Sequence, residues 1–246
     1  MTAFAAHLGM EVRLALRKGE TLLLTLGIPV VFLIFFAKVH VVSVPTASGI
    51  AFMFPGIVAL SVMSSAMVSL SISTGFERSF GVLLRLQATP LGTKRLLGAK
   101  IVCVGIVEVL QVAVLALVAT LLGYSFPSSL GVLSSVSQAL SIILLATAAF
   151  AGIGLTMAGR LKGEVNLAAA NGLYLVLLLV SGMVVPIGKL GGLGTVARLL
   201  PSGALASGLH ALWSFGQPVG SGTWIVLGFW ALTMPALAAA TFRFAP

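Results

Sequence analysis

Six long apolar segments constrain this chain more than any other feature of its sequence. They run over residues 21–42, 49–75, 101–123, 138–158, 165–187 and 223–242. A helix needs about 20 apolar residues to cross the hydrocarbon core of a bilayer, and each segment reaches that length. Open sheets would leave unpaired backbone groups at their edges in lipid, so helices are expected throughout. The sequence therefore predicts an all-α membrane protein with about six transmembrane helices.

Charged residues are too rare to form a water-soluble surface. They make up 8% of the 246 residues, whereas soluble domains carry about a quarter. The formal net charge of +9 would suggest nucleic acid as a partner of a soluble protein. Here the basic residues stand between apolar segments, and no basic stripe alternates with aromatic residues. We therefore expect membrane lipid, and no nucleic acid, among the partners.

The distribution of Lys and Arg predicts the orientation. With the N-terminus in the cytoplasm, 11 of the 14 basic residues fall on the cytoplasmic side of six spans. Lys38, Lys189 and Arg198 fall outside. Cytoplasmic loops carry the excess of Lys and Arg, so both termini are predicted to be cytoplasmic.

The first 20 residues are predicted to form an amphipathic helix on the cytoplasmic surface of the membrane. Phe4, Leu8, Val12 and Leu16 recur every four residues and would share one face, with charged residues on the other faces. The alternative is a ragged extension of the first span, which is expected to be a retained helix and not a signal peptide. The expected division is therefore 1–20 for the interfacial helix and 21–246 for a six-helix transmembrane domain. Residues 188–222 would form an external helical or re-entrant segment.

The cytoplasmic link between the second and third spans, residues 77–100, is long for a turn and mixes apolar with basic residues. Phe80, Leu83 and Leu84 would lie on one side of a short helix. An amphipathic helix of this kind can insert into a groove on a protein partner, or it can lie on the lipid surface. The composition of the link is compatible with both interpretations.

Short motifs recur along the link and after the fifth span. They are Glu77-Arg78, Leu83-Leu84, Ala88-Thr89-Pro90 and Gly98-Ala99-Lys100 in the link, and Ser181-Gly182, Pro186 and Leu200-Pro201 after the fifth span. These motifs resemble the signature of the ABC-2 permease family, which includes the daunorubicin-type drug-efflux permeases. The chain departs from the family pattern at Phe80-Gly81-Val82, where a Thr after the Gly is commoner, and at Gly98-Ala99-Lys100, where Gly-Lys is commoner.

The resemblance implies the permease subunit of an ABC exporter in a bacterial plasma membrane. Such a permease works as a dimer, with a second copy or a close relative, and with two copies of a separate ATPase subunit. The link resembles the coupling helix that inserts into the ATPase, and the N-terminal helix resembles the connecting helix of the family. The residues expected to couple to the ATPase are Glu77, Arg78, Phe80, Leu83, Leu84, Arg85, Thr89 and Pro90.

The chain itself is expected to be a transport subunit without an ATPase site. No Gly-x-x-x-x-Gly-Lys-Ser/Thr loop occurs in it, so ATP and Mg would be bound by the partner. One cysteine and three widely separated histidines predict neither a disulfide nor a metal site. We expect no catalytic residues and no cofactor in this chain.

Polar residues on two of the apolar spans predict either a substrate path or a dimer seam, although plain helix packing is the alternative. The second span carries serines at a spacing of four, and the fifth span carries polar residues on one face. A path of this composition would suit an amphipathic or hydrophobic substrate such as a drug or a lipid. The residues concerned are Ser61, Ser65, Met67, Ser69, Asn171, Tyr174 and Ser181.

Glu108 is the acid inside a predicted span. An ionisable residue in the membrane is a functional hypothesis by default, and Lys100, Lys94 or Arg243 could pair with it. Conformational coupling and a proton relay are further possibilities. Two other functions stay open on the sequence: a small secondary transporter coupled through Glu108, and a non-transporting membrane scaffold.

Overall fold

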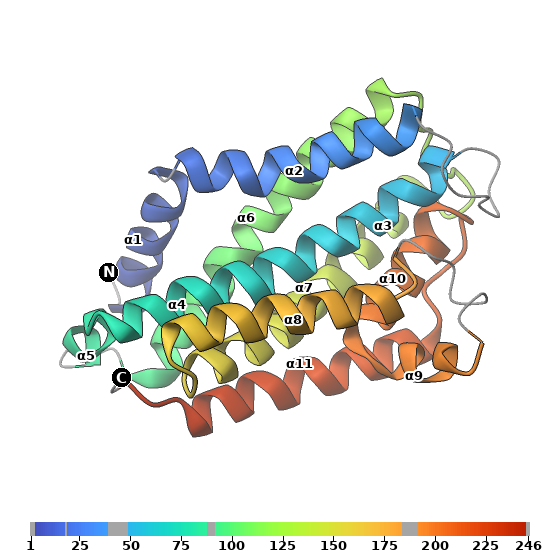
Figure 1. Ribbon diagram of the computed structural model, residues 1–246. Coiled ribbons are helices and arrows are strands. Elements are labelled where there is room, and N and C mark those ends of the chain that lie inside the picture. The colour runs from blue at the N-terminus through green and yellow to red at the C-terminus, as the bar shows by residue number, and fades with distance from the viewer. Residues whose placement is uncertain (1–2, 18, 39–48, 88–91, 184–190, 245–246) are drawn as a thin grey trace.

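The computed structural model describes residues 3–17, 19–38, 49–87, 92–183 and 191–244, and every regular element within these ranges is a helix. The helices form one elongated bundle (Figure 1). In chain order they are α1 (Ala3–Arg17), α2 (Gly19–Lys38), α3 (Gly49–Met63), the π-helix η1 (Ser64–Ser69), α4 (Leu70–Ser79), α5 (Val82–Gln87), α6 (Thr93–Leu121), α7 (Val132–Ala158), α8 (Gly163–Val180), α9 (Leu193–Leu199), α10 (Pro201–Trp213) and α11 (Ser221–Thr241).

Within the described ranges, five helical segments are long and apolar enough to cross a membrane. The first of them is the continuous run of α3, η1 and α4, and the others are α6, α7, α8 and α11. α2 extends along the bundle beside α3 and α6 and supplies a sixth traverse (Figure 1). The prediction of an all-α membrane protein with about six helices is confirmed.

The fifth span ends earlier than its hydropathy suggests. α8 stops at Val180, although the apolar sequence continues. Gly182 follows with a φ of 77°, a left-handed conformation that glycine adopts without strain. The Ser181 hydroxyl donates to the Leu178 carbonyl at 2.9 Å and accepts the Met183 N–H at 3.2 Å. These bonds satisfy backbone groups that the helix end leaves unpaired.

α7 lies at the centre of the bundle because two glycines let it approach other helices closely. A Cβ on Gly152 would lie 2.5 Å from the backbone of Met234 and Pro235 in α11. A Cβ on Gly154 would lie 2.6 Å from the carbonyl oxygen of Met67 in η1. Close backbone approach at small residues is the usual way in which helices associate in lipid.

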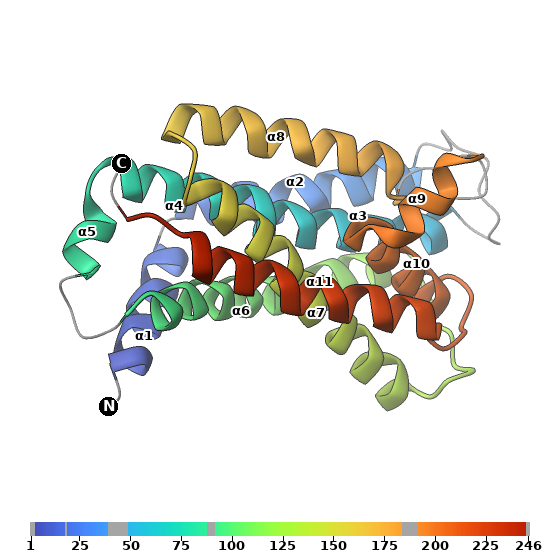
Figure 2. The ribbon, with the colours of Figure 1, turned by 90° about the horizontal axis from the view of Figure 1, so that it is seen from below.

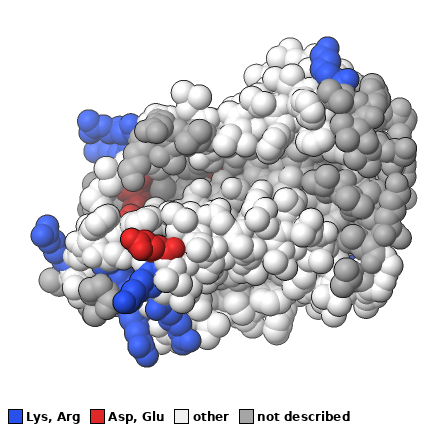
Figure 3. All heavy atoms as spheres, in the orientation of Figure 1, with Lys and Arg blue, Asp and Glu red and all other residues white. Residues whose placement is uncertain are grey.

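Both termini lie at the same end of the bundle (Figures 1 and 2). Figure 3 shows that the basic side chains gather mainly at this end. By the positive-inside rule it is the cytoplasmic end. Among the described residues, Lys38 and Arg198 lie at the opposite end, at the end of α2 and in α9. The basic residues at the cytoplasmic end are Arg13, Arg17, Arg78, Arg85, Lys94, Arg95, Lys100, Arg160, Lys162 and Arg243.

The external end is closed by α9 and α10, which fall within the expected external segment 188–222. α10 packs against α3 and α7 with most of its residues buried. The carbonyl of its Trp213 accepts a hydrogen bond of 2.5 Å from the Tyr124 hydroxyl.

His210 of α10 is buried, which lowers its pKa, so the imidazole is neutral. The ring stacks on Phe52 of α3 with the ring centroids 4.3 Å apart. α10 is therefore an integral helix of the bundle and not a surface loop.

Candidate coupling segment and polar groove

A tight turn places α5 at the cytoplasmic tip of the bundle (Figure 1). Gly81 has a φ of 71°, which permits the reversal after α4. The Phe80 side chain is 75% exposed and that of Leu84 is 42% exposed, and Arg85 is also exposed. Leu83 is fully buried. Phe80, Leu83 and Leu84 were expected on one side of this helix, but only Leu83 is buried, and it packs the segment against the rest of the bundle.

The second half of the link leads into the third span. α6 begins at Thr93, and Gly92 with a φ of 69° precedes it at the N-cap. Thr89 and Pro90, which were expected to couple to the ATPase, lie outside the described residues.

Arg78 faces the interior of the bundle. Its side chain is 6% exposed, and Nη1 donates to the carbonyl oxygens of Ala158 at 2.8 Å and of Leu161 at 2.9 Å. Ala158 is the last residue of α7 and Leu161 lies just beyond it, where a helix end presents unpaired acceptors and partial negative charge. Arg78 therefore connects the end of α4 to the end of α7.

Glu77 also faces inward, where it joins a buried ion cluster with Lys100 of α6 and Glu11 of α1. Lys100 Nζ lies 2.8 Å from Glu77 Oε2 and 2.9 Å from Glu11 Oε1, and the Lys100 side chain is 2% exposed. His7 Nε2 lies 3.4 Å from the same Glu11 oxygen. A buried ammonium requires paired charges around it, and the two carboxylates supply them.

This cluster shows which side of the N-terminal helix packs on the bundle. His7 and Glu11 both point toward α6, where Lys100 pairs with Glu11. Phe4 contacts Gly98 of α6, whereas Leu16 is 49% exposed on the outside of the bundle. The spacing of the apolar residues does not predict the ion pair with Lys100, and the position of α1 on the membrane surface stays a prediction.

A buried amide connects α8 to α4 in the same region. The Ser71 hydroxyl donates to Asn166 Oδ1 at 2.9 Å, and Asn166 Nδ2 donates to the Ser71 carbonyl at 2.8 Å. A Cβ on Gly75 would lie 2.6 Å from Asn166 Nδ2, so glycine leaves the space that the amide fills. α4 is thus held by polar contacts to α6, α7 and α8, and through Lys100 it is linked to α1.

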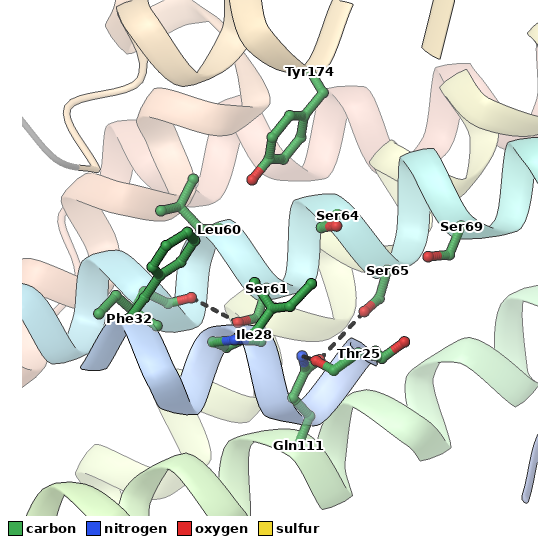
Figure 4. Close-up of a pocket in the computed structure, with 12 residues that line it drawn as sticks. Thr25, Ile28, Phe32, Leu60, Ser61, Ser64, Ser65, Ser69, Gln111 and Tyr174 are labelled. Carbon is green, nitrogen blue, oxygen red and sulfur yellow. Dashed lines mark hydrogen bonds between the residues drawn. The ribbon is translucent and has the colours of Figure 1, made fainter. Parts of the chain in front are cut away.

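Two cavities follow the α3–η1–α4 rod along its length and together form what we call the polar groove. The mid-membrane cavity, about 100 Å³, is shown in Figure 4. It is lined by Thr25, Ile28, Pro29, Phe32, Ile57, Leu60, Ser61, Ser64, Ser65, Ser69, Gln111 and Tyr174. The cytoplasmic cavity, about 170 Å³, is lined by Glu11, Leu14, Ala15, Thr25, Ser65, Ser69, Leu70, Ser73, Glu77, Lys100, Cys103, Val104 and Val107. Thr25, Ser65 and Ser69 line both cavities, so the two cavities are adjacent along the rod.

The π-helix η1 forms the wall where the two cavities meet. Its six residues, Ser64–Ser69, form a π-helical turn within the continuous rod, and such π-bulges occur frequently at functional sites. The Ser65 hydroxyl donates to Gln111 Oε1 at 3.3 Å, and Gln111 Nε2 donates to the carbonyl of Thr25 at 2.7 Å. One amide therefore bridges η1, α6 and α2 at the centre of the groove (Figure 4).

The structure brings together only part of the predicted path. Ser61, Ser65, Ser69 and Tyr174 line the groove, and the Tyr174 hydroxyl points into it (Figure 4). Met67 instead is fully buried against α7.

The other two predicted path residues lie away from the groove. Asn171 is exposed on α8, where its amide donates to the Leu167 carbonyl at 2.9 Å. Ser181 terminates α8, as described above. The groove residues that sequence reasoning missed include Thr25 and Gln111. Both are polar side chains inside apolar spans, which is the signal that singled out Glu108.

Glu108 is fully buried between α6 and α7 and does not form the expected ion pair. Its Oε2 shares a hydrogen bond with the Thr147 hydroxyl, and Oε1 has no hydrogen-bond partner among the described residues. Lys100, one of the cations considered as its partner, is engaged by Glu11 and Glu77. Glu108 is therefore remote from the ion cluster and does not line either cavity.

Comparison with known proteins agrees with this architecture. Residues 2–212 match the family model described as ABC-2 type transporter. No match to the chain was found among curated proteins. The family model covers most of the 246 residues, from α1 through the turn between α4 and α5 to α10. The chain therefore belongs to the ABC-2 type transporter family and is the membrane-spanning permease component of an ABC-type transporter.

Proposed function

We propose that this permease exports an amphipathic or hydrophobic substrate along the polar groove, driven by a separate ATPase that docks on the cytoplasmic tip. The observation that carries the proposal is the exposed apolar surface of Phe80, Val82 and Leu84, at the end of the bundle where the basic residues gather. Exposed apolar residues on a short helix outside the lipid fit a groove on a protein partner. ATP and Mg would be bound by that partner.

The contacts beneath the tip provide a route for motion. A displacement of α5 acts directly on α4, because Leu83 is buried and the two helices pack together. From α4 it reaches α7 through Arg78, and α1 and α6 through Glu77. ATP hydrolysis moves these helices only if the ATPase binds two arrangements of the tip with different affinities.

A second copy of the permease, or a close relative, would complete the transporter at the exposed face of α8. Asn171 lies on this face together with large exposed apolar residues, among them Leu175 and Leu179. Exposing the polar amide of Asn171 to lipid in the middle of a span costs free energy. A second permease packed against this face would shield the amide from lipid. The assembly would consist of two permeases and two ATPase subunits in a bacterial plasma membrane.

The docking surface can be tested with one substitution at each end of the molecule. Phe80→Ala removes the most exposed ring of the tip, and Phe215→Ala removes an exposed ring at the external end as a matched control. In proteoliposomes that contain the permease and its ATPase, Phe80→Ala should weaken binding of the ATPase by about tenfold or more, as for an interface anchor. ATP-dependent transport should fall in parallel, while Phe215→Ala should leave both unchanged. Equal behaviour of the two variants would refute docking at the tip.

A further inference from the structure

We propose that the cytoplasmic cavity of the polar groove binds the cationic head group of a lipophilic molecule. The inference rests on the proposed transport function for its role, because it assigns a charge class to the substrate of the same groove. It concerns the segment of the groove between α1, α4 and α6, of whose lining the predicted path included only Ser65 and Ser69.

The charges that line this cavity present a negative surface. Glu11 and Glu77 are 16% and 28% exposed as side chains, whereas Lys100 between them is 2% exposed. The ammonium therefore lies beneath the two carboxylates. Among the described lining residues no other charged side chain occurs, so two carboxylates and one ammonium line the cavity.

The rest of the cavity suits a molecule with a polar head and an apolar body. The walls are largely aliphatic, with Leu14, Leu70 and Val107 among them, and the exposed serines Ser69 and Ser73 lie on the α4 side. Little water competes with a ligand in such a site, so an ion–carboxylate interaction is stronger there than at an open surface.

The continuation of the groove supports a cation rather than an anion. The mid-membrane cavity contains hydroxyls, one amide and the rings of Phe32 and Tyr174, with no charged residue among its described lining. Aromatic faces attract cations, so a cationic group that leaves the carboxylates meets rings and hydroxyl oxygens further along. An anion would approach the two carboxylates first and would be repelled.

Cys103 makes the local charge measurable, because the single cysteine of the chain lines this cavity. Methanethiosulfonate reagents convert a thiol to a mixed disulfide and release methanesulfinate. The cationic trimethylammonium-ethyl reagent and the anionic sulfonato-ethyl reagent can be compared on the purified permease–ATPase complex in nanodiscs. We expect the cation-to-anion ratio of rates at Cys103 to exceed that of a free thiol by about fivefold or more, as charges at this range in a partly buried site would produce.

Variants identify the source of the preference. Glu11→Gln should reduce the ratio by about threefold or more, because one carboxylate is lost. Glu164→Gln removes a carboxylate at the cytoplasmic end of α8, which does not line the cavity, and should leave the ratio unchanged. Cys103→Ser should abolish labelling and so confirms the labelled site.

Binding is tested by protection of Cys103 against the small neutral reagent methyl methanethiosulfonate. Tetraphenylphosphonium should slow this labelling by about fivefold or more in the wild type, as expected for a ligand well above its dissociation constant. The anion tetraphenylborate, of nearly the same size and shape, should not, and Glu11→Gln should weaken the protection by the cation.

Each contrary result counts against the proposal. Absence of labelling by all three reagents would show that the cavity is closed, and equal rates for the two charged reagents would show that it is not negative. Equal protection by the two tetraphenyl ions would show binding without charge selection. None of these results bears on docking of the ATPase, which is measured separately through Phe80→Ala, so the two proposals fail independently.

Discussion

Glu108 is a buried carboxyl group with no cation beside it in the described part of the chain, and its contact with Thr147 indicates that the carboxyl is protonated. The Thr147 hydroxyl lies 2.8 Å from the Ile143 carbonyl, which can only accept. A hydroxyl has one proton, so when Thr147 donates to this carbonyl, the hydrogen of its contact with Glu108 must come from the carboxyl. A protonated carboxyl is neutral, and burial between α6 and α7 then needs no cation.

Substitutions at Glu108 test this assignment. Glu108→Gln keeps a donor of the same length, and the free energy of unfolding should change by less than about 1 kcal/mol. Glu108→Ala removes the donor and leaves a cavity, with an expected loss of about 2–4 kcal/mol. Denaturation of the purified permease in detergent measures both. The assignment fails if the two variants are equally unstable, and loss of transport in Glu108→Gln alone would instead favour a proton-coupled transporter.

Arg78 provides a second prediction at the residue scale. Arg78→Ala leaves the carbonyls of Ala158 and Leu161 without this donor, and hydrogen bonds from a charged group contribute about 1.5–3 kcal/mol each. We expect the free energy of unfolding to fall by at least about 2 kcal/mol. Arg85→Ala, at the exposed tip, is the control and should have little effect on stability. Similar stability losses in both variants would contradict a structural role specific to Arg78.

Among the elements, α1 and α5 show where local patterns stop being sufficient. The four-residue spacing in α1 correctly indicates an amphipathic helix, but a cation on α6 decides which side packs inward. In α5 the pair Leu83-Leu84 reads as one apolar surface, yet one side chain is buried and the other exposed. In both cases the deciding contact comes from a residue or helix outside the segment.

The contact between α7 and η1 yields a prediction at the scale of elements. Gly154→Ala would place a methyl group about 2.6 Å from the Met67 carbonyl, which belongs to the backbone and cannot rotate away. Such overpacking costs about 1–3 kcal/mol, seen as a lower midpoint of thermal unfolding. Gly172→Ala is the matched control, since nothing lies within 4 Å of its Cβ, and it should stabilise the permease slightly by favouring the helix. Equal shifts would mean that α7 does not pack this tightly.

For the whole molecule, the six traverses and the charge asymmetry together assign the two sides of the membrane. Hydrogen bonds join the ends of α4, α7 and α11 at one end, where Arg78 and Arg243 contact the turn after α7. That end also contains α1 and the tip. A topology with an odd number of spans would separate these contacts.

The assignment of sides can be tested by labelling. In a Cys103→Ser background, Gln217→Cys and Lys94→Cys place a thiol at an exposed position on each end. A membrane-impermeant maleimide added to right-side-out vesicles should label position 217 and should label position 94 only after the membrane is permeabilised. The reverse pattern would place α5 outside and would refute ATPase docking at the tip.

The sequence alone determined the class of the protein, the approximate number of spans, their orientation and the location of the cytoplasmic link at residues 77–100. These properties follow from hydropathy, from Lys and Arg counts and from local motifs, which act over one segment at a time. The break in α8, by contrast, depends on a turn within a continuously apolar stretch, and hydropathy does not detect it.

Only the tertiary structure decided which polar side chains meet. Lys100 lies far from Glu11 in the sequence, and Gln111 far from Thr25, yet each pair is in contact across helices. In lipid, many helix faces satisfy the hydrophobic requirement equally well, so hydropathy leaves the rotation of each helix open. Buried ion pairs, amide bridges and close glycine contacts stabilise one rotation of each helix about its axis. In that arrangement the polar side chains line the polar groove.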